Sequence, residues 1–230
     1  MKIKLVEVFP SFQGEGEDSG KKMVIIRFKY CNRIYNKLTC PFCDTVQKLN
    51  SSKVTEYSLE DIQKVIDDFG PGAGILITGG EPTFSLENRA INNFNETTTL
   101  LKELNYSIAN VESNGYNLIG LTECILCHEN INFMYSPKVF TLNELIETKE
   151  NIKNMVNIES IKFKIVYQNN DLVHNILDCL SEYKLHDRTF LMSEGKTRDE
   201  LIKNSEDTLK AANKYKFNFS SRLHIIHNFT

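Results

Sequence analysis

The chain has 230 residues, of which 41% are hydrophobic and 25% charged, and its formal net charge is -3. These are globular values, so they argue against disorder and against a broad basic surface for direct nucleic-acid binding. The length suits a single domain, 1–230, or at most two small ones. Because no apolar run is long enough for a membrane span or signal peptide, we expect a cytoplasmic protein without membrane contact.

Short apolar runs alternate with longer segments of helical periodicity. Strands are predicted at Ile3–Val8, Met23–Phe28, Ile75–Thr78, Ser107–Glu112, Asn132–Tyr135, Ile161–Val166, Thr189–Met192 and Leu223–Ile226. Helices are predicted at Ser58–Phe69, Leu86–Leu104, Leu142–Val156, Asp171–Tyr183 and Thr197–Tyr215. This alternation predicts an α/β fold in which helical crossovers join mostly parallel strands, with a partial (βα) barrel as the first choice. In such folds the functional residues follow the carboxyl ends of the strands.

Three cysteines, Cys31, Cys40 and Cys43, lie within 13 residues directly after the second predicted strand. Thiolates favour zinc or an iron–sulfur cluster. A structural zinc site usually takes four ligands, and no fourth cysteine or histidine lies nearby, so zinc is disfavoured but stays open. Three ligands on a four-iron cluster would leave one iron free to bind a substrate or cofactor.

Four further motifs follow later strands. Ile75-Leu-Ile-Thr-Gly-Gly-Glu-Pro82 combines a glycine turn, which permits close backbone approach, with a carboxylate that can hold an ammonium group. Val111-Glu-Ser-Asn-Gly115, Ser136-Pro-Lys138 and Phe190-Leu-Met-Ser-Glu-Gly195 come after the next strands. Taken singly, each is also typical of an ordinary turn at a strand end.

Other segments carry polar groups suited to a small anionic ligand. Phe12-Gln-Gly-Glu-Gly16 joins the first two strands, and the fork of Arg27 matches a carboxylate. Asp44-Thr45 follows the third cysteine, and Ser221-Arg-Leu-His224 lies near the C-terminus. As isolated patterns these indicate a hairpin loop, a surface arginine, a loop threonine and a strand histidine.

Cys124-Ile-Leu-Cys127-His128 can bind a metal, but no second pair completes the pattern, so free thiols are the preferred interpretation. Cys179 falls within an amphipathic helix and is expected in the core.

In their order, seven segments from Glu7 to Thr230 resemble the 7-carboxy-7-deazaguanine synthases, which are radical S-adenosylmethionine enzymes. The chain departs from the usual motif of that superfamily in the eight residues between Cys31 and Cys40, where three are usual. Members of the synthase family tolerate an enlarged gap here, and Ser113 and Ser193 replace a threonine and a proline of the family pattern.

The resemblance implies a [4Fe–4S] cluster, S-adenosylmethionine and Mg²⁺ as cofactors. Residues 31–45 would form the cluster loop, with Cys31, Cys40 and Cys43 as ligands, and Thr45 would bind Mg²⁺. Cofactor-binding residues would be Asp44, Gly79, Gly80, Glu81, Glu112, Asn114, Ser136, Pro137, Lys138, Met192 and Glu194. Substrate-binding residues would be Phe12, Gln13, Gly14, Glu15, Arg27, Thr78, His224 and Thr230. The last two belong to segment 217–230, which would form the C-terminal part of the substrate pocket.

The implied reaction converts 6-carboxy-5,6,7,8-tetrahydropterin to 7-carboxy-7-deazaguanine with loss of ammonia, for 7-deazapurine (queuosine-type) biosynthesis. A 5′-deoxyadenosyl radical would abstract hydrogen from the substrate, after an external donor such as flavodoxin supplies an electron. Relatives are homodimers. A glycyl-radical-enzyme activase, which shares the cluster and cofactor motifs, and a non-catalytic regulatory protein on this fold are the alternatives.

Overall fold

The computed structural model describes residues 2–43, 45–125 and 130–229. Backbone contacts divide the chain into two compact units. The first unit contains the N-terminal residues up to Gln13 together with Gly20–Phe133. The second contains Gly14–Ser19 and the chain from Met134 onward, so the boundary falls inside strand β9 (Ile131–Tyr135).

The sheet of the first unit places four strands side by side in the order β8 (Ala109–Ser113), β5 (Gly74–Gly79), β3 (Lys22–Phe28) and β2 (Glu7–Phe12). β2 runs antiparallel to β3, whereas β3, β5 and β8 are parallel. Residues on both faces of these strands are buried, from Met23, Ile25 and Leu76 on one face to Ile26 and Ile77 on the other. Burial on both faces explains why the strands have nearly continuous apolar sequences.

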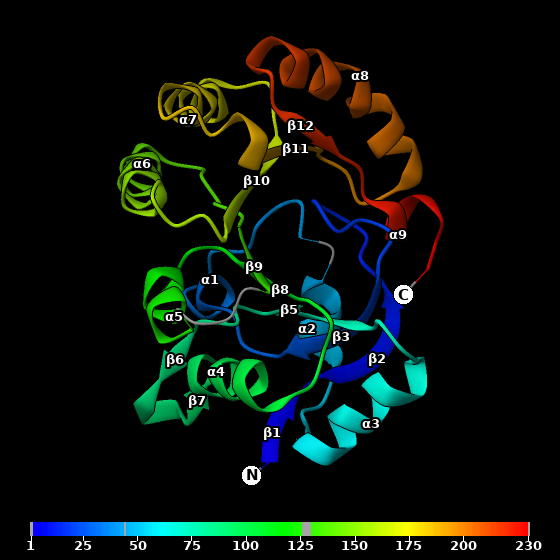
Figure 1. Ribbon diagram of the computed structural model, residues 1–230. Coiled ribbons are helices and arrows are strands. Elements are labelled where there is room, and N and C mark those ends of the chain that lie inside the picture. The colour runs from blue at the N-terminus through cyan, green and yellow to red at the C-terminus, as the bar shows by residue number, and fades with distance from the viewer. Residues whose placement is uncertain (1, 44, 126–129, 230) are drawn as a thin grey trace. The chain divides into compact units, whose positions relative to one another are not determined.

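The remaining elements of the first unit connect and cover this sheet (Figure 1). Its helices are α1 (Asn32–Tyr35), α2 (Val46–Ser51), α3 (Leu59–Phe69), the 3₁₀ turn η1 (Glu87–Arg89), α4 (Asn93–Glu103) and α5 (Leu118–Cys124). Two small antiparallel pairs join β1 (Lys2–Leu5) to β4 (Thr55–Ser58), and β6 (Ser85–Leu86) to β7 (Ile91–Asn92).

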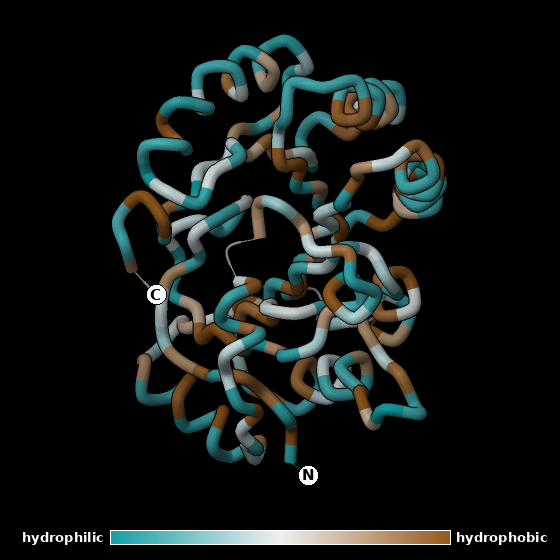
Figure 2. Tube along the Cα trace, turned by 180° about the vertical axis from the view of Figure 1, so that it is seen from behind, coloured by the Kyte–Doolittle hydropathy of each residue, from teal (hydrophilic) through white to brown (hydrophobic). Residues whose placement is uncertain are grey.

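In the second unit, β10 (Ile161–Tyr167), β11 (Thr189–Ser193) and β12 (Asn218–Ser220) are parallel neighbours. Their connections contain α7 (Asp171–Glu182), η2 (His186–Arg188) and α8 (Arg198–Tyr215), while α6 (Leu142–Met155) precedes β10 and α9 (Leu223–Ile226) ends the unit. In Figure 2, α8 is mostly hydrophilic with a few hydrophobic residues, as an amphipathic surface helix should be.

Local sequence signals account for the best-predicted helix starts. Ser58 and Asp61 form the expected capping box of α3, and Thr197 and Glu200 form that of α8. Each box satisfies backbone N–H groups that have no partner within the helix. The predicted α/β class, with mostly parallel strands and helical crossovers, is confirmed.

Three predicted elements were wrong in detail. Leu223–Ile226 forms the helix α9 and not a strand, because a four-residue apolar run carries no periodicity that separates the two. The predicted helix Leu86–Leu104 begins only at Asn93, after η1 and β7. The strand predicted at Ile3–Val8 is divided between β1 and β2. No helix within the described ranges is long and apolar enough to cross a membrane.

Candidate functional site

The cysteine loop begins where β3 ends. Cys31 is the residue immediately before α1, a short helix formed by the enlarged gap, and Cys40 and Cys43 share a turn in which the Cys43 N–H donates to the Cys40 carbonyl at 3.1 Å. All three cysteines are partly buried. Burial, chiefly, raises the pKa of the Cys31 thiol to about 11, and the charges of Glu81 and Cys40 add to the shift.

Between residues 2 and 229, outside positions 44 and 126–129, no three histidine, cysteine, aspartate or glutamate side chains are grouped to hold one metal ion. Cysteines that ligate an iron–sulfur cluster bind separate iron atoms, and therefore need not converge on one point. The donor set of three accessible thiols on a single loop suits such a cluster.

Asn32, the first residue of the enlarged gap, connects the cysteine loop to the end of β8. The Asn114 side-chain amide donates to Asn32 Oδ1 at 2.8 Å and lies 4.0 Å from Cys31 Sγ. Cys31 Sγ itself is 3.7 Å from Asn32 Oδ1. The cofactor residue Asn114 predicted from the sequence is thus placed beside a predicted cluster ligand, and sequence reasoning missed Asn32 as the residue between them.

The glycine turn after β5 packs against the chain just before Cys31. The Gly80 N–H donates to the Phe28 carbonyl at 2.9 Å, and the Glu81 N–H donates to the Tyr30 carbonyl at 2.8 Å. A Cβ atom on Gly80 would lie 2.1 Å from the Tyr30 carbonyl oxygen, and Gly79 has a φ of +102°. Both glycines are therefore required by the backbone itself, which brings residues 79–81 next to the cysteine loop.

Glu81 is 1% exposed, and its carboxylate accepts four hydrogen bonds from its own chain. Oε1 accepts from Thr83 N–H (3.0 Å), Thr83 Oγ1 (2.6 Å) and Ser113 Oγ (2.7 Å), while Oε2 accepts from Asn114 N–H at 2.7 Å. Burial raises the pKa of Glu81, and these donated hydrogen bonds oppose the shift. The side chain fastens the end of β5 to the turn after β8, and its contact with a cofactor stays a prediction.

A polar row crosses the carboxyl-terminal side of the first unit's sheet. Glu7, Arg27 and Thr78 are register partners on β2, β3 and β5. Arg27 Nε donates to Glu7 Oε1 at 2.7 Å, and Thr78 Oγ1 donates to Glu112 Oε2 at 3.1 Å. Register partners on adjacent strands point to the same face of a sheet. The fold therefore unites two predicted substrate residues, Arg27 and Thr78, with the predicted cofactor residue Glu112.

The other predicted residues of the first unit lie apart from this row. Phe12 is 47% exposed and packs edge-on against Phe69 with ring centroids 6.3 Å apart. Gln13 is buried, and its backbone bonds to Lys21 and Gly20 close the hairpin. Thr45 precedes α2 and is partly buried. Asp44, Thr230, Cys127 and His128 lie outside the described residues.

Among the predicted residues of the second unit, Glu15 and Gly14 meet His224. Glu15 Oε1 lies 3.8 Å from His224 Nε2, and a Cβ on Gly14 would come within 2.2 Å of His224 Nδ1. Glu15 also binds Lys164 and Arg222, two residues that sequence reasoning did not assign to the site. The overlooked signal was Lys164 itself, a lysine inside the apolar strand β10.

The remaining second-unit residues flank two strand ends. Lys138 Nζ donates to Ser136 Oγ at 2.7 Å, next to the buried Pro137. Met192 is buried in β11, and Glu194 accepts from Gln168 Nε2 at 2.9 Å. Outside the cysteine loop, Cys124 is exposed at the end of α5, and Cys179 is buried in α7, which confirms its predicted place in the core.

Known proteins resemble the chain in sequence and in fold. It is 32% identical over 96 residues to a 7-carboxy-7-deazaguanine synthase of Bacteroides thetaiotaomicron, covering 42% of this chain and 47% of the relative. It is 41% identical over 81 residues to that of Haemophilus influenzae, covering 35% and 34%. With that of Clostridium acetobutylicum it shares 28% identity over 199 residues, covering 82% and 79%.

The matched segments thus span less than half the length of the first two relatives. No protein-family model matches the chain. The crystal structure of QueE from Escherichia coli matches with a TM-score of 0.56 at 19% identity, covering 97% of this chain and 95% of that one. The resemblance read from the strand-end motifs is therefore confirmed: the chain is a sequence relative of the 7-carboxy-7-deazaguanine synthases and shares the fold of QueE.

Proposed function

We propose that this protein is a radical S-adenosylmethionine lyase that converts 6-carboxy-5,6,7,8-tetrahydropterin to 7-carboxy-7-deazaguanine and ammonia, in queuosine-type biosynthesis. The observation that carries the proposal is the meeting of Cys31, Asn114 and the turn at residues 79–81 at the strand ends of one sheet. Similarity to 7-carboxy-7-deazaguanine synthases supplies the substrate.

Residues of the cysteine loop would hold the cofactors. Cys31, Cys40 and Cys43 would ligate a [4Fe–4S] cluster and leave one of its four irons without a protein ligand. The backbone of residues 79–81, together with Asn114, would bind S-adenosylmethionine beside the cluster. When bound, the cluster and S-adenosylmethionine supply the radical chemistry. Thr45 would ligate Mg²⁺, and Asp44 is among the proposed cofactor-binding residues. Ser136, Pro137, Lys138, Met192 and Glu194 are the residues of the second unit that we propose to contact S-adenosylmethionine.

The polar residues would orient the pterin. The Arg27 guanidinium, which pairs with Glu7 in this structure, offers a fork that fits the substrate carboxylate bidentately. Thr78 lies in the same row and would donate to a substrate oxygen. Glu15 and His224 would accept hydrogen bonds from the pyrimidine edge of the pterin. Phe12, Gln13, Gly14 and Thr230 are the other proposed substrate-binding residues.

The proposal extends to the working state of the protein. An external one-electron donor such as flavodoxin would reduce the cluster, and two chains would form a homodimer in which residues 1–230 act as one functional domain. The cytoplasm is the proposed compartment, because it keeps thiols reduced, as the cysteine ligands of a cluster require. No direct role in binding nucleic acid or membrane is proposed.

An anaerobic assay tests the function. The protein is reconstituted with iron and sulfide, reduced, and supplied with S-adenosylmethionine, Mg²⁺ and the carboxytetrahydropterin, and the product is identified by mass spectrometry. We expect 7-carboxy-7-deazaguanine. Formation of 5′-deoxyadenosine without that product would reject the substrate and favour a glycyl-radical-enzyme activase. A loaded cluster with neither compound would favour a non-catalytic regulatory protein.

A matched pair of variants locates the substrate carboxylate. Arg27→Lys keeps the positive charge but loses the fork, so the KM for the pterin should rise roughly tenfold or more. Lys48→Arg is the control, because Lys48 binds the same Glu7 carboxylate, with Nζ 2.7 Å from Oε2, from a more exposed position. An unchanged KM in Arg27→Lys would contradict the carboxylate assignment.

A further inference from the structure

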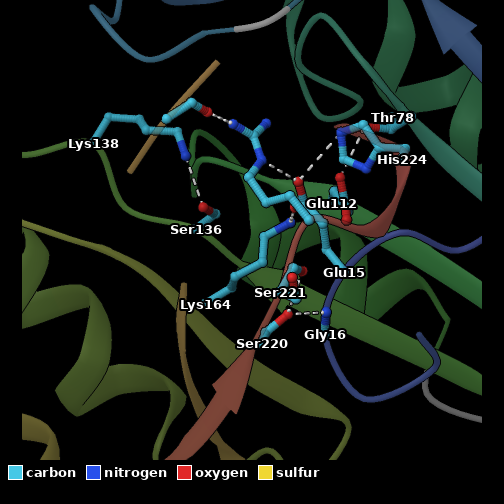
Figure 3. Close-up of polar contacts among 12 residues, drawn as sticks. Glu15, Gly16, Thr78, Glu112, Ser136, Lys138, Lys164, Ser220, Ser221 and His224 are labelled. Carbon is cyan, nitrogen blue, oxygen red and sulfur yellow. Dashed lines mark hydrogen bonds and ion pairs between the residues drawn. The ribbon is translucent and has the colours of Figure 1, made fainter. Parts of the chain in front are cut away.

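Three charged side chains meet inside the second unit, from three distant parts of the sequence. As whole residues, Glu15 is 8% exposed, Lys164 3% and Arg222 7%. Lys164 Nζ donates to Glu15 Oε2, and Arg222 Nε donates to Glu15 Oε1 at 2.9 Å. Each carboxylate oxygen is therefore held by a different cation, and the plane of the carboxylate is fixed by both. Figure 3 shows the Lys164 ammonium group reaching toward Glu15.

Arg222 is itself anchored at its other end. Its Nη1 donates to the Gly195 carbonyl at 2.7 Å, so the guanidinium bridges Glu15 and the loop after β11. Backbone contacts complete the connection around it. Leu223 N–H donates to the Gly14 carbonyl at 2.9 Å, and Gly16 N–H donates to Ser220 Oγ at 2.7 Å. The loop at residues 14–19 is thereby fastened to segment 220–224 on both sides of Glu15.

Stability alone does not explain this cluster of buried charges. Moving a lysine, an arginine and a carboxylate out of water carries a large desolvation cost, and apolar side chains of the same volume often stabilise a protein equally well. β10 is otherwise apolar at its buried positions, so an aliphatic residue at 164 would suit the strand. The network is better explained by the orientation that it imposes on Glu15 and on the adjacent His224.

We propose that Lys164 and Arg222 are positioning residues that hold the Glu15 carboxylate, and with it the loop at residues 14–19, in the orientation that binds the pterin. The inference rests on the proposed function, since the ligand of Glu15 is the pyrimidine edge of that substrate. Fixed carboxylate geometry matters there because two parallel hydrogen bonds to adjacent N–H groups require both oxygens in one plane.

β10 supplies its own control. Lys162 lies two residues before Lys164, on the same face of the strand, and pairs with Glu17 of the same loop at 3.5 Å. That pair is more open, with side-chain exposures of 19% and 44% against 4% and 9% for Lys164 and Glu15. Lys162→Met thus removes the same charge from the same strand and loop without touching Glu15.

The test compares Lys164→Met, Arg222→Lys, Lys164→Arg and Lys162→Met in the reconstituted enzyme. We measure the Kd of the pterin in the presence of S-adenosylmethionine, KM and kcat separately, the Kd of S-adenosylmethionine, and iron content. Lys164→Met and Arg222→Lys should weaken pterin binding roughly tenfold to a hundredfold, with iron content and S-adenosylmethionine binding unchanged. Lys164→Arg should recover part of the loss, and Lys162→Met should stay within about twofold of the wild type.

Amide hydrogen exchange gives a second readout that needs no substrate. Exchange at residues 14–19 should accelerate in Lys164→Met and Arg222→Lys but not in Lys162→Met. If Lys164→Met does not fold, Arg222→Lys decides by the same two measurements. If the wild type converts the pterin but Lys164→Met and Arg222→Lys bind it with unchanged Kd, this inference is overturned and the proposed function stands. The same holds if Lys162→Met weakens pterin binding as much as those two variants do. A wild type that neither binds nor converts the pterin would overturn the proposed function and this inference with it.

Discussion

Replacing Glu81 by glutamine should lower the free energy of unfolding by about 2 kcal/mol, although the two side chains have nearly the same shape. Each hydrogen bond to a charged acceptor is worth about 1 kcal/mol more than its neutral counterpart, and Glu81 accepts four. The amide of the new glutamine can take two orientations. In one its NH₂ group faces the Asn114 N–H, and in the other it faces the donors of Thr83 and Ser113, so a donor meets a donor in both. Relief of the buried carboxylate's desolvation offsets part of this loss.

The measurement is urea denaturation followed by far-UV circular dichroism before cluster reconstitution, because bound cofactors shift the apparent stability. Glu112→Gln is the matched control, since that carboxylate belongs to the neighbouring strand β8, is only partly buried and accepts a hydrogen bond from Thr78. It should change the unfolding free energy by less than about 1 kcal/mol. The reasoning would be refuted if the free energy of unfolding of Glu81→Gln lay within about 0.5 kcal/mol of the wild-type value. It would also be refuted if Glu112→Gln lowered that free energy as much as Glu81→Gln does.

Three further changes test other parts of the structure. Gly80→Ala should cost about 1–3 kcal/mol in urea denaturation, because its Cβ would lie 2.1 Å from the Tyr30 carbonyl oxygen; wild-type stability would contradict that close approach. Cys40→Ala should abolish iron–sulfur absorbance after reconstitution while the apoprotein Tm moves by less than about 3 °C, and global unfolding would show a mainly structural role. Burial raises the pKa of Tyr135 from its ordinary 10.0 to about 12, because the charged phenolate is disfavoured inside the fold. The contribution of this tyrosine to stability is therefore complete below pH 10.0 and decreases as the pH rises from there toward about 12. Tyr135→Phe should therefore lose less stability than the wild type as the pH rises from 10.0 toward about 12, and identical pH profiles would contradict the shift.

Close spacing made several features predictable from the sequence. The capping boxes of α3 and α8 join residues three positions apart, so their hydrogen bonds follow from local order alone. Apolar runs located the central strands, and the cysteines and the Gly79-Gly80 turn followed strand ends, where parallel sheets expose functional groups. The family resemblance rested on the same strand-end segments.

Other features depend on residues that only the tertiary structure brings together. Glu15 meets Lys164 and Arg222 across 149 and 207 positions of sequence, and no local pattern marks such partners. The sequence suggested that Gly80 allows close approach of a ligand, whereas in the structure a Cβ atom at this position would clash with the backbone of Tyr30. Short-range hydrogen bonds and periodic burial are encoded within a few residues, whereas the choice of a buried charge's partner is made by how strands and loops pack.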